Sequence, residues 1–542
     1  MSAFLARPLG PLGGTHPDVL NRRIRELLLI GASGAIPLAL ALGISVEVAH
    51  PSLLLLLALT AGGLGVVALM TSERYPLTVT LVALYLGLLE GPLKLGTGAH
   101  AEASVIRDVL IFSVSLGAVL RLVVKKERVM LPAMSAWVIG FVALVVVEAF
   151  NPSTHGILKV LGGFRQQLEW VPFFFFAYTI MRSKERFRKL FLVLGVIALA
   201  NGVVSTYQSR LSPTQLASWG PGYRELVYGT IEQGETSGRG GRTGLAGRTF
   251  VSEGVSRVRP MALGTDAGFG GGVGVVALPG IIALLAIGRL RRRWPVLLLC
   301  AGALLAVTTG LGRTQVVGAV VAVFSFALLS FSAGQVSRAL LALLGVLVLA
   351  LPLGAVLVSA EGSGTFSRYA ELAPGSVANA KDKKTAEYAA MPHQIEAAPF
   401  GVGLGTVGSA AGFGGKVSET LEGHGVGAAT VWKLILDELG LPGLLLWIAF
   451  LIRLLVLALP GLRRIPDFEL RLDLAAVFAS FIAFIIMGFS GPTMTSAALG
   501  PFFWFTAGIA AYWFAGPGRT ALRASSIPAA GIPTASVVPA SA

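Results

Sequence analysis

Long apolar runs separated by short polar connections dominate the pattern of this chain. Runs of about 20 residues recur from Leu27 to Phe514, and a helix of that length crosses a bilayer core of roughly 30 Å. The pattern therefore predicts about 14 membrane-spanning helices. Their expected ranges are residues 27–46, 53–70, 77–95, 109–122, 133–147, 171–181, 190–206, 268–288, 295–309, 316–331, 339–360, 440–457, 474–488 and 499–515.

Composition agrees with this pattern, since 54% of the 542 residues are hydrophobic, 13% are charged and the mean hydropathy is +0.76. We therefore expect an all-α polytopic membrane protein with a single transmembrane domain over residues 27–515. Residues 1–26 form a short segment before it, and residues 516–542, rich in Ala, Pro and Ser, have the composition of a disordered tail. The single cysteine, Cys300, lies within an apolar run, which excludes a disulfide framework and a thiolate metal site.

Basic residues predict the orientation of the chain. A net charge of +15 would suggest a nucleic-acid partner for a soluble protein, but here Lys and Arg gather in alternate short connections, and we expect no such partner. By the positive-inside rule these connections and both termini face the cytoplasm, which makes residues 208–259 and 361–425 two long extracytoplasmic loops. The first apolar run is long and follows about 25 polar residues, so no cleavable signal peptide is recognisable. The basic clusters are Arg22, Arg23 and Arg25; Lys125, Lys126 and Arg128; Arg182, Lys184, Arg186, Arg188 and Lys189; Arg289, Arg291, Arg292 and Arg293; Arg463 and Arg464; and Arg519 and Arg523.

A few arginines lie on the predicted outer side, where the same rule expects few. Arg165 lies in LGGFRQQLEW, Arg257 and Arg259 lie in SRVRPMALG, and Arg313 lies in TTGLGRTQ, each near the outer end of a predicted span. Any one of them could cap a helix or snorkel to the interface. Together they suggest an anion site, because guanidinium groups match phosphate oxygens. The other arginines of the first outer loop, interpreted as solvated charge, are Arg210, Arg224, Arg239, Arg242 and Arg248.

His424 is the candidate proton acceptor. A structural role is common for a loop histidine, but this one lies in GHGVGAATVWKLILDELG, a few residues before an amphipathic helix that then turns into a span. The helix carries Lys433, Asp437 and Glu438 on its polar part, and the turn is expected at residues 440–443. An imidazole at the membrane rim, with an unperturbed pKa of about 6.5, suits proton transfer near neutral pH. Glu422 could orient or assist it.

Other motifs have simpler interpretations. GFGGGVG, at residues 268–274, superficially matches a phosphate loop, but it lies within an apolar span and follows no strand, which indicates close helix packing. GVGLG, at residues 401–405, lets the loop backbone bend and approach a ligand closely. Arg107 and Asp108 are expected to form a structural pair. Neither outer loop has an Asp-x-Asp pair or a His/carboxylate cluster with ligand spacing, so the sequence predicts no metal and no cofactor.

Several of these segments resemble one family. APFGVGLGTVG, followed after a long gap by His424 and DELGLPGLLLWIAF, resembles the signature region of the O-antigen ligase and O-antigen polymerase superfamily. Arg313 in TTGLGRTQVVG is similar to that family's arginine at the outer start of a span, and RVRPMALGTDAGFGGG is similar to its arginine-bearing loop exit. FNPSTHGILKVLGGFRQQLEW resembles a span entry of polymerase-like members. The likeness in topology covers most of the chain, but many ligases have Asn directly after the histidine, where this chain has Gly425.

The resemblance implies a fold of the GT-C type in a bacterial inner (plasma) membrane. It implies transfer of a glycan from a polyprenyl (undecaprenyl) diphosphate to a sugar hydroxyl on the extracytoplasmic face, without a metal. Arg313, Arg259, Arg165 and Arg257 would hold the diphosphate, while His424, assisted by Glu422, would deprotonate the acceptor. Direct displacement would invert the anomeric carbon. The implied partners are the lipid-linked oligosaccharide, a glycan acceptor, the bilayer and other membrane proteins of polysaccharide assembly.

Alternatives stay open at this point. Polymerisation of a cell-surface polysaccharide is favoured over ligation to lipid A core or protein by the FNP…GFRQQL entry and the missing Asn after His424. A secondary transporter would also have many spans, but it would place charges near the midplane, with broken helices and internal repeats. Here the charges lie at span ends and no repeat is recognisable. A structural or channel-like protein would leave the outer arginines unexplained.

Overall fold

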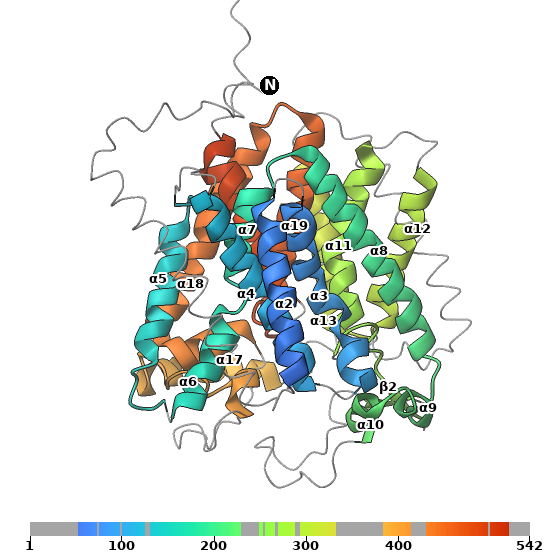
Figure 1. The fold of residues 1–542 in the computed structure, drawn as a ribbon, viewed down its shortest axis with the longest axis vertical. Helices are drawn as coiled ribbons and strands as arrows, with labels where there is room; N and C mark the ends of the chain where they lie inside the picture. The colour runs from blue at the N-terminus through green and yellow to red at the C-terminus, as the bar shows by residue number, and fades with distance from the viewer. Residues whose placement is uncertain are drawn as a thin grey trace, which may run out of the picture.

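The computed structural model describes residues 53–72, 75–97, 100–124, 131–154, 156–228, 249–252, 255–265, 269–287, 293–331, 383–412, 430–496 and 499–519 (Figure 1). These residues fold as helices with one short hairpin. The elements are α2 (Leu53–Thr71), α3 (Pro76–Thr97), α4 (His100–Val124), α5 (Ser135–Glu148), α6 (Ile157–Leu168), α7 (Pro172–Ile180), α8 (Lys184–Gln208), α9 (Pro213–Ala217), α10 (Pro221–Tyr228), β1 (Thr249–Ser252), β2 (Val255–Val258), α11 (Phe269–Ile287), α12 (Arg293–Thr309), α13 (Arg313–Phe331), α17 (Lys383–Ala397), η3 (Gly408–Gly412), α18 (Val431–Arg463), α19 (Phe468–Gly488), α20 (Gly500–Ala510) and the π-helix η5 (Ala511–Ala515).

The predicted spans coincide with these helices wherever the structure describes them. Two predicted spans, residues 27–46 and 339–360, lie outside the described residues. By length and composition, five helices of the described residues could cross a membrane: α8, α11, α13, α18 and α19. Shorter apolar helices form in parts of α2, α3, α5 and α12. The helical class and the candidate spans are thus confirmed, while the total number of spans and the GT-C type stay predictions.

Exposed apolar stripes on the outer helices support a membrane location. On α13, Val320, Phe324 and Leu328 are 64%, 68% and 62% exposed and follow one another at helical spacing along one face. A helix surrounded by water would place polar residues there. By contrast, α11 is buried nearly all round, with 89% of its apolar window inside the protein. The helices therefore form a bundle with an apolar interior and an apolar rim.

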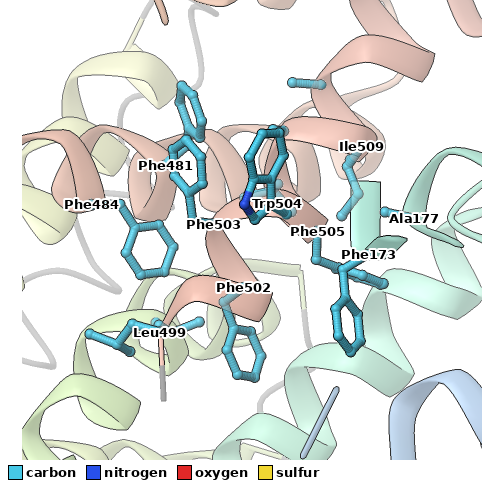
Figure 2. Packing of buried hydrophobic residues seen from close by; sticks show 14 of the residues in the cluster. Phe173, Ala177, Phe481, Phe484, Leu499, Phe502, Phe503, Trp504, Phe505 and Ile509 are labelled. Carbon is cyan, nitrogen blue, oxygen red and sulfur yellow. The ribbon is translucent and has the colours of Figure 1, made fainter. Parts of the chain in front are cut away.

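An aromatic core ties together α7, α19 and α20. Figure 2 shows Phe481 and Phe484 of α19 beside Phe502 and Phe503 of α20, with Phe173 of α7 close by. The rings of Phe481 and Phe503 stack with centroids 5.4 Å apart and planes 17° apart. Such packing removes large apolar areas from contact with lipid and fixes the helices relative to one another. The connection between α19 and α20 lies at the end of this core, which includes Leu499.

The described parts of the two predicted outer loops lie at the same end of the bundle. The first loop supplies α9, α10, β1 and β2, and the second supplies α17 and η3; α6, α9, α10, β2 and α17 all lie at the lower end in Figure 1. The antiparallel hairpin, with Thr249 opposite Val258, is the one departure from an all-α fold among the described residues. This arrangement agrees with both loops lying on the same side, and we call this end of the bundle the loop end.

Candidate functional site

A glycine-rich turn at the loop end, residues 398–412 and here called the glycine loop, begins the candidate site. Its left-handed glycines are Gly401, Gly403, Gly405 and Gly408, with φ of 89°, 87°, 69° and 72°. Residues with a Cβ rarely adopt these angles. A Cβ at Gly403 would also overlap the side chain of Thr154, whose Oγ1 accepts a hydrogen bond from the Leu404 N–H at 3.1 Å. The predicted bending of this loop is confirmed, and the bend presses its backbone against α6.

Alanine at Gly403 is expected to destabilise the protein more than alanine at Gly156. Gly156 also has a left-handed φ, of 88°, but a Cβ there meets nothing within 4 Å. Gly156, with a ψ of 157°, lies in a backbone region that is almost restricted to glycine, so Gly156→Ala should cost the backbone strain alone, about 1–3 kcal/mol. Gly403→Ala adds the overlap with Thr154. Thermal unfolding of the purified variants in detergent measures the difference. Equal unfolding temperatures would contradict the close packing of the glycine loop.

The start of α18 is a short helix that bends at Gly440. Thr430 caps it by accepting a hydrogen bond from the Lys433 N–H at 3.2 Å. Gly440 has a φ of 64°, and a Cβ there would overlap the backbone of the glycine loop at Phe400. The Leu441 N–H donates to the Pro399 carbonyl at 2.8 Å, which fixes the loop against the bend. The turn expected at residues 440–443 is thus confirmed, at its first residue.

Glu438 is the centre at which these segments meet. Its carboxylate is fully buried and accepts hydrogen bonds from Gln167 Nε2 at 2.7 Å and Gln166 Nε2 at 3.1 Å. Backbone groups of Gly405 and Val407 also hydrogen-bond to it. A buried carboxylate is tolerated only where several donors replace water. One acidic side chain therefore joins the glycine loop, α6 and the bend of α18.

The polar part of the first α18 turns, expected from the sequence to carry Lys433, Asp437 and Glu438, is buried within the protein. Lys433 and Asp437 form an ion pair, with Lys433 Nζ donating to Asp437 Oδ1 at 2.7 Å, and both are buried. The Val402 N–H donates to the Asp437 carbonyl at 2.7 Å. The glycine loop covers this face because its own backbone groups need partners.

Lys159 of α6 clamps the far end of the glycine loop. Its ammonium donates to the Ala411 carbonyl at 2.6 Å, and Gln166 Oε1 accepts from the Ala410 N–H at 3.0 Å. Burial lowers the pKa of Lys159, and the nearby Glu438 carboxylate acts to raise it. The chain therefore enters residues 413–429 from a fixed position.

Arg165 lies in a cluster of four charged residues. Its guanidinium contacts Asp108 Oδ2 at 3.0 Å and Glu169 Oε2 at 3.7 Å. Arg107 contacts Glu169 Oε1 at 2.7 Å and Asp108 Oδ1 at 3.7 Å, and it lies over the Trp170 ring at 4.9 Å. The expected pair of Arg107 and Asp108 is confirmed as part of this larger cluster. Two carboxylates balance two guanidinium groups here, so Arg165 already has anionic partners, and its role in diphosphate binding stays a prediction.

Glu169 controls the net charge of this cluster. Burial raises the pKa of its carboxyl group, while Arg107 acts to lower it. Protonation of Glu169 would leave two guanidinium groups facing one carboxylate, which favours an incoming anion. The sequence analysis missed Glu169, Gln166 and Gln167. Their signal was a run of polar residues, RQQLE, placed directly before the aromatic span.

Arg313 is the first residue of α13. The first turn of α13 is connected to the start of α18 by a hydrogen bond and a ring contact. Thr314 Oγ1 and Ser490 Oγ are hydrogen-bonded at 2.9 Å, and Ser490 follows Phe489 at the end of α19. The Phe489 ring packs on Trp432, the second residue of α18, with centroids 4.7 Å apart. The N-terminus of α13 is therefore connected, through two contacts, to the point where the chain leaves residues 413–429.

The segment that follows Arg259 packs against α8 and the start of α11. Gln208 at the end of α8 holds the residues that follow Arg259, because its Oε1 accepts from the N–H groups of Met261 and Ala262 at 2.9 and 2.7 Å. A Cβ at Gly270 would approach Ala262, and one at Gly271 would approach Gln315 of α13. The prediction that GFGGGVG serves close helix packing is confirmed, and these glycines separate the Arg259 segment from the Arg313 helix. Arg257 lies in β2 opposite Phe250.

The connection between α19 and α20 contacts α13, α11 and a residue of the charge cluster's surroundings. Its Ser490 contacts Thr314 of α13. At its far end Leu499 packs closely on α11, since a Cβ added to Gly272 would lie 3.1 Å from the Leu499 side chain. A Cβ on Gly500 would meet the Trp170 ring at 2.6 Å, and Trp170 carries Arg107 over its face. The first turn of α13, next to Arg313, and Trp170, next to the charge cluster, thus both contact this connection, whereas the segment after Arg259 packs on α8 and the start of α11.

His424 and Glu422 lie outside the described residues, and their roles stay predictions. Both ends of the segment that contains them, residues 413–429, are nevertheless held at the site, by Lys159 on one side and by Trp432 on the other. Arg210 and Arg224 are exposed, as expected for solvated charge. Across the part of the chain that the structure describes, no group of three or more His, Cys, Asp or Glu side chains could hold a metal ion.

Comparisons with known proteins add no relative. The chain matches no family model, no curated protein and no solved structure. Any function must therefore be argued from the motifs and from the contacts that bring them together.

Proposed function

We propose that this chain is a membrane glycosyltransferase that moves a glycan from a polyprenyl diphosphate to a sugar hydroxyl. The observation that supports the proposal is the meeting of motif segments around Glu438. FRQQLEW in α6, the glycine loop and DELG in α18 lie far apart in the sequence, yet Gln166, Gly405 and Glu438 share hydrogen bonds. These are segments on which the resemblance to the O-antigen ligase and polymerase superfamily rests.

The chemistry needs two parts, a holder for the diphosphate and a base for the acceptor hydroxyl. Diphosphate is a good leaving group, and guanidinium groups stabilise the charge that develops on it without a metal. Arg313 and Arg259 are assigned to the diphosphate, with Arg165 and Arg257 as further members of the set. His424, assisted by Glu422, is assigned to remove the hydroxyl proton. Attack on the anomeric carbon then expels the lipid diphosphate with inversion.

The fixed ends of residues 413–429 explain how such a base would be positioned. Lys159 holds the chain before this segment, while the cap at Thr430 and the packing of Trp432 hold it afterwards. The second anchor is tied to the first turn of α13 through Ser490, so a base in the segment shares a framework with Arg313.

We place the reaction on the extracytoplasmic face of a bacterial inner membrane, with both termini in the cytoplasm. Polymerisation of a cell-surface polysaccharide is the proposed outcome, and ligation to lipid A core or to protein is the alternative with the same donor. The lipid-linked oligosaccharide, the glycan acceptor and other polysaccharide-assembly proteins are the proposed partners.

A secondary transporter is a second candidate, favoured by one observation. The break of α18 at Gly440, next to the buried Glu438, is a feature that transporters use for ion or substrate sites. Proteoliposomes supplied with a lipid-linked oligosaccharide separate the two classes. A new glycosidic product with free polyprenyl diphosphate identifies the transferase, and counterflow of a soluble solute without product identifies the transporter.

Arg313→Ala is expected to slow donor consumption by about 10²–10³-fold, because the leaving diphosphate loses a charged hydrogen-bond donor. Arg224→Ala, which removes an exposed arginine of α10, is the matched control and should leave the rate unchanged. The initial rate of lipid-linked donor consumption by purified protein measures both. An Arg313→Ala variant that consumes donor as fast as the parent would end this assignment.

A further inference from the structure

A lateral pocket opens between α3 and α8 at the loop end of the bundle. It encloses about 450 Å³, within the range of small-molecule sites. Pro92 and Gly96 of α3 line one wall, Val203 and Tyr207 of α8 line the opposite wall, and residues 262–263 also line it. Trp219 and Tyr223, from α10 and the turn before it, complete the lining. We call it the α3–α8 pocket.

Three aromatic rings give this pocket a fixed apolar wall. Tyr207 and Trp219 stack with centroids 5.8 Å apart and planes 20° apart, and Tyr223 meets Trp219 edge-on at 5.6 Å. The array joins the end of α8 to the first outer loop. Rings held in this way offer a large apolar contact area that needs little ordering when a ligand binds.

The pocket continues an apolar stripe on α8. Val196, Val203 and Tyr207 are each 57% exposed, and their spacing of seven and four residues places them on one helix face. Val203 and Tyr207 line the pocket, while Val196 lies two turns away toward the middle of the helix. An exposed apolar face on a candidate span lies against lipid chains, so the pocket opens sideways into the bilayer.

An arginine lies close in the sequence to the pocket wall that residues 262–263 form. Arg259 precedes Ala262 by three residues, and Gln208 and Asn201 of α8 fix the backbone between Met261 and Leu263. An apolar pocket that is open to lipid, with an arginine three residues before its wall in the sequence, suits an amphiphile with one apolar chain and a phosphate head.

We infer that the α3–α8 pocket holds the diphosphate-proximal isoprene units of the lipid-linked donor, with the diphosphate directed toward Arg259. The inference rests on the proposed function and assigns the lipid part of its substrate to named residues. A dry cavity of about 150 Å³ accepts a six-carbon benzene ring, so about 450 Å³ accommodates roughly 18 carbons, or three to four isoprene units.

Binding of geranylgeranyl diphosphate, which has four isoprene units, tests the inference in nanodiscs of phosphatidylcholine. Val203→Trp fills the pocket from the α8 wall and should weaken this binding by about tenfold or more, because the isoprene units lose their apolar contacts. Val196→Trp is the matched control, since it places the same ring on the same face of α8 outside the pocket. Binding of inorganic diphosphate should be the same in both variants, whereas Arg259→Ala should weaken both ligands.

Equal affinities of Val203→Trp and Val196→Trp for geranylgeranyl diphosphate would overturn the inference. Competition by phosphatidylglycerol as strong as that by unlabelled geranylgeranyl diphosphate would overturn it too, because the pocket would then be a phospholipid site. A benzophenone-tagged geranyl diphosphate should crosslink the unaltered protein within α3, α8 or α10, which tests the same point without a variant. Crosslinks confined to other helices contradict it.

Glycan transfer by the unaltered protein separates this inference from the proposed function. If Val203→Trp loses binding of geranylgeranyl diphosphate and the unaltered protein transfers no glycan, the proposed function is wrong and the lipid pocket is supported. Normal transfer together with unchanged binding in Val203→Trp would overturn only the pocket.

Discussion

His424→Ala is expected to reduce glycan transfer by about 10²–10⁴-fold, the usual contribution of a positioned general base. The variant should still insert, fold and bind the lipid-linked donor, because the contacts that anchor the ends of its segment involve Lys159, Thr430 and Trp432 rather than the imidazole. Product yield and chain length, measured on purified protein, give the result.

His393→Ala is the matched control for this prediction. His393 lies in the same outer loop, on α17, with its side chain 79% exposed beside Glu396. An exposed pair of this kind contributes little, so transfer should stay at the parental level. Near-normal product from His424→Ala would remove the histidine from the mechanism, whatever the behaviour of the control.

Glu438→Ala is expected to have the largest effect on stability. The substitution leaves the amides of Gln166 and Gln167 and the backbone N–H groups of the glycine loop without an acceptor in a buried site. Each unsatisfied buried donor costs about 1–3 kcal/mol, so the total loss should be on the order of 3 kcal/mol or more. Transfer should be lost as well, because the glycine loop no longer fixes one end of residues 413–429.

Glu396→Ala gives the comparison for Glu438→Ala, since it removes the same carboxylate from an exposed position on α17. Thermal unfolding in detergent should separate the two variants by many degrees. Glu438→Gln should have an intermediate unfolding temperature. Its amide oxygen still accepts a hydrogen bond, but its amide nitrogen is a donor that faces the other donors around this position. A Glu438→Ala protein as stable as Glu396→Ala would show that the carboxylate does not join these segments.

Helix positions could be predicted from the sequence because the apolar runs are long and continuous. Residues 268–288 were expected as a span and form α11 over Phe269–Ile287, since an apolar helix satisfies its own backbone in lipid. The bend at Gly440 was also predictable, because the sequence GLPG interrupts the helix pattern there.

The contacts of the polar residues could not be predicted in the same way. Arg165 was expected to bind diphosphate, cap a helix or snorkel, yet it lies against Asp108, a residue of the distant helix α4. Glu438 was interpreted as part of a polar helix face, although the glycine loop and α6 bury it. Such pairings join residues far apart in the chain, and no periodicity in the sequence specifies them.

Stoichiometric release of polyprenyl diphosphate tests most directly whether the chain is a glycosyltransferase that uses a lipid-diphosphate donor. Purified protein in proteoliposomes, given a defined lipid-linked oligosaccharide, should release one polyprenyl diphosphate for each glycosidic bond formed, and His424→Ala should release almost none while still binding the donor. Bond formation without diphosphate release, or no bond formation by a folded protein that binds both donor and acceptor, would contradict the account.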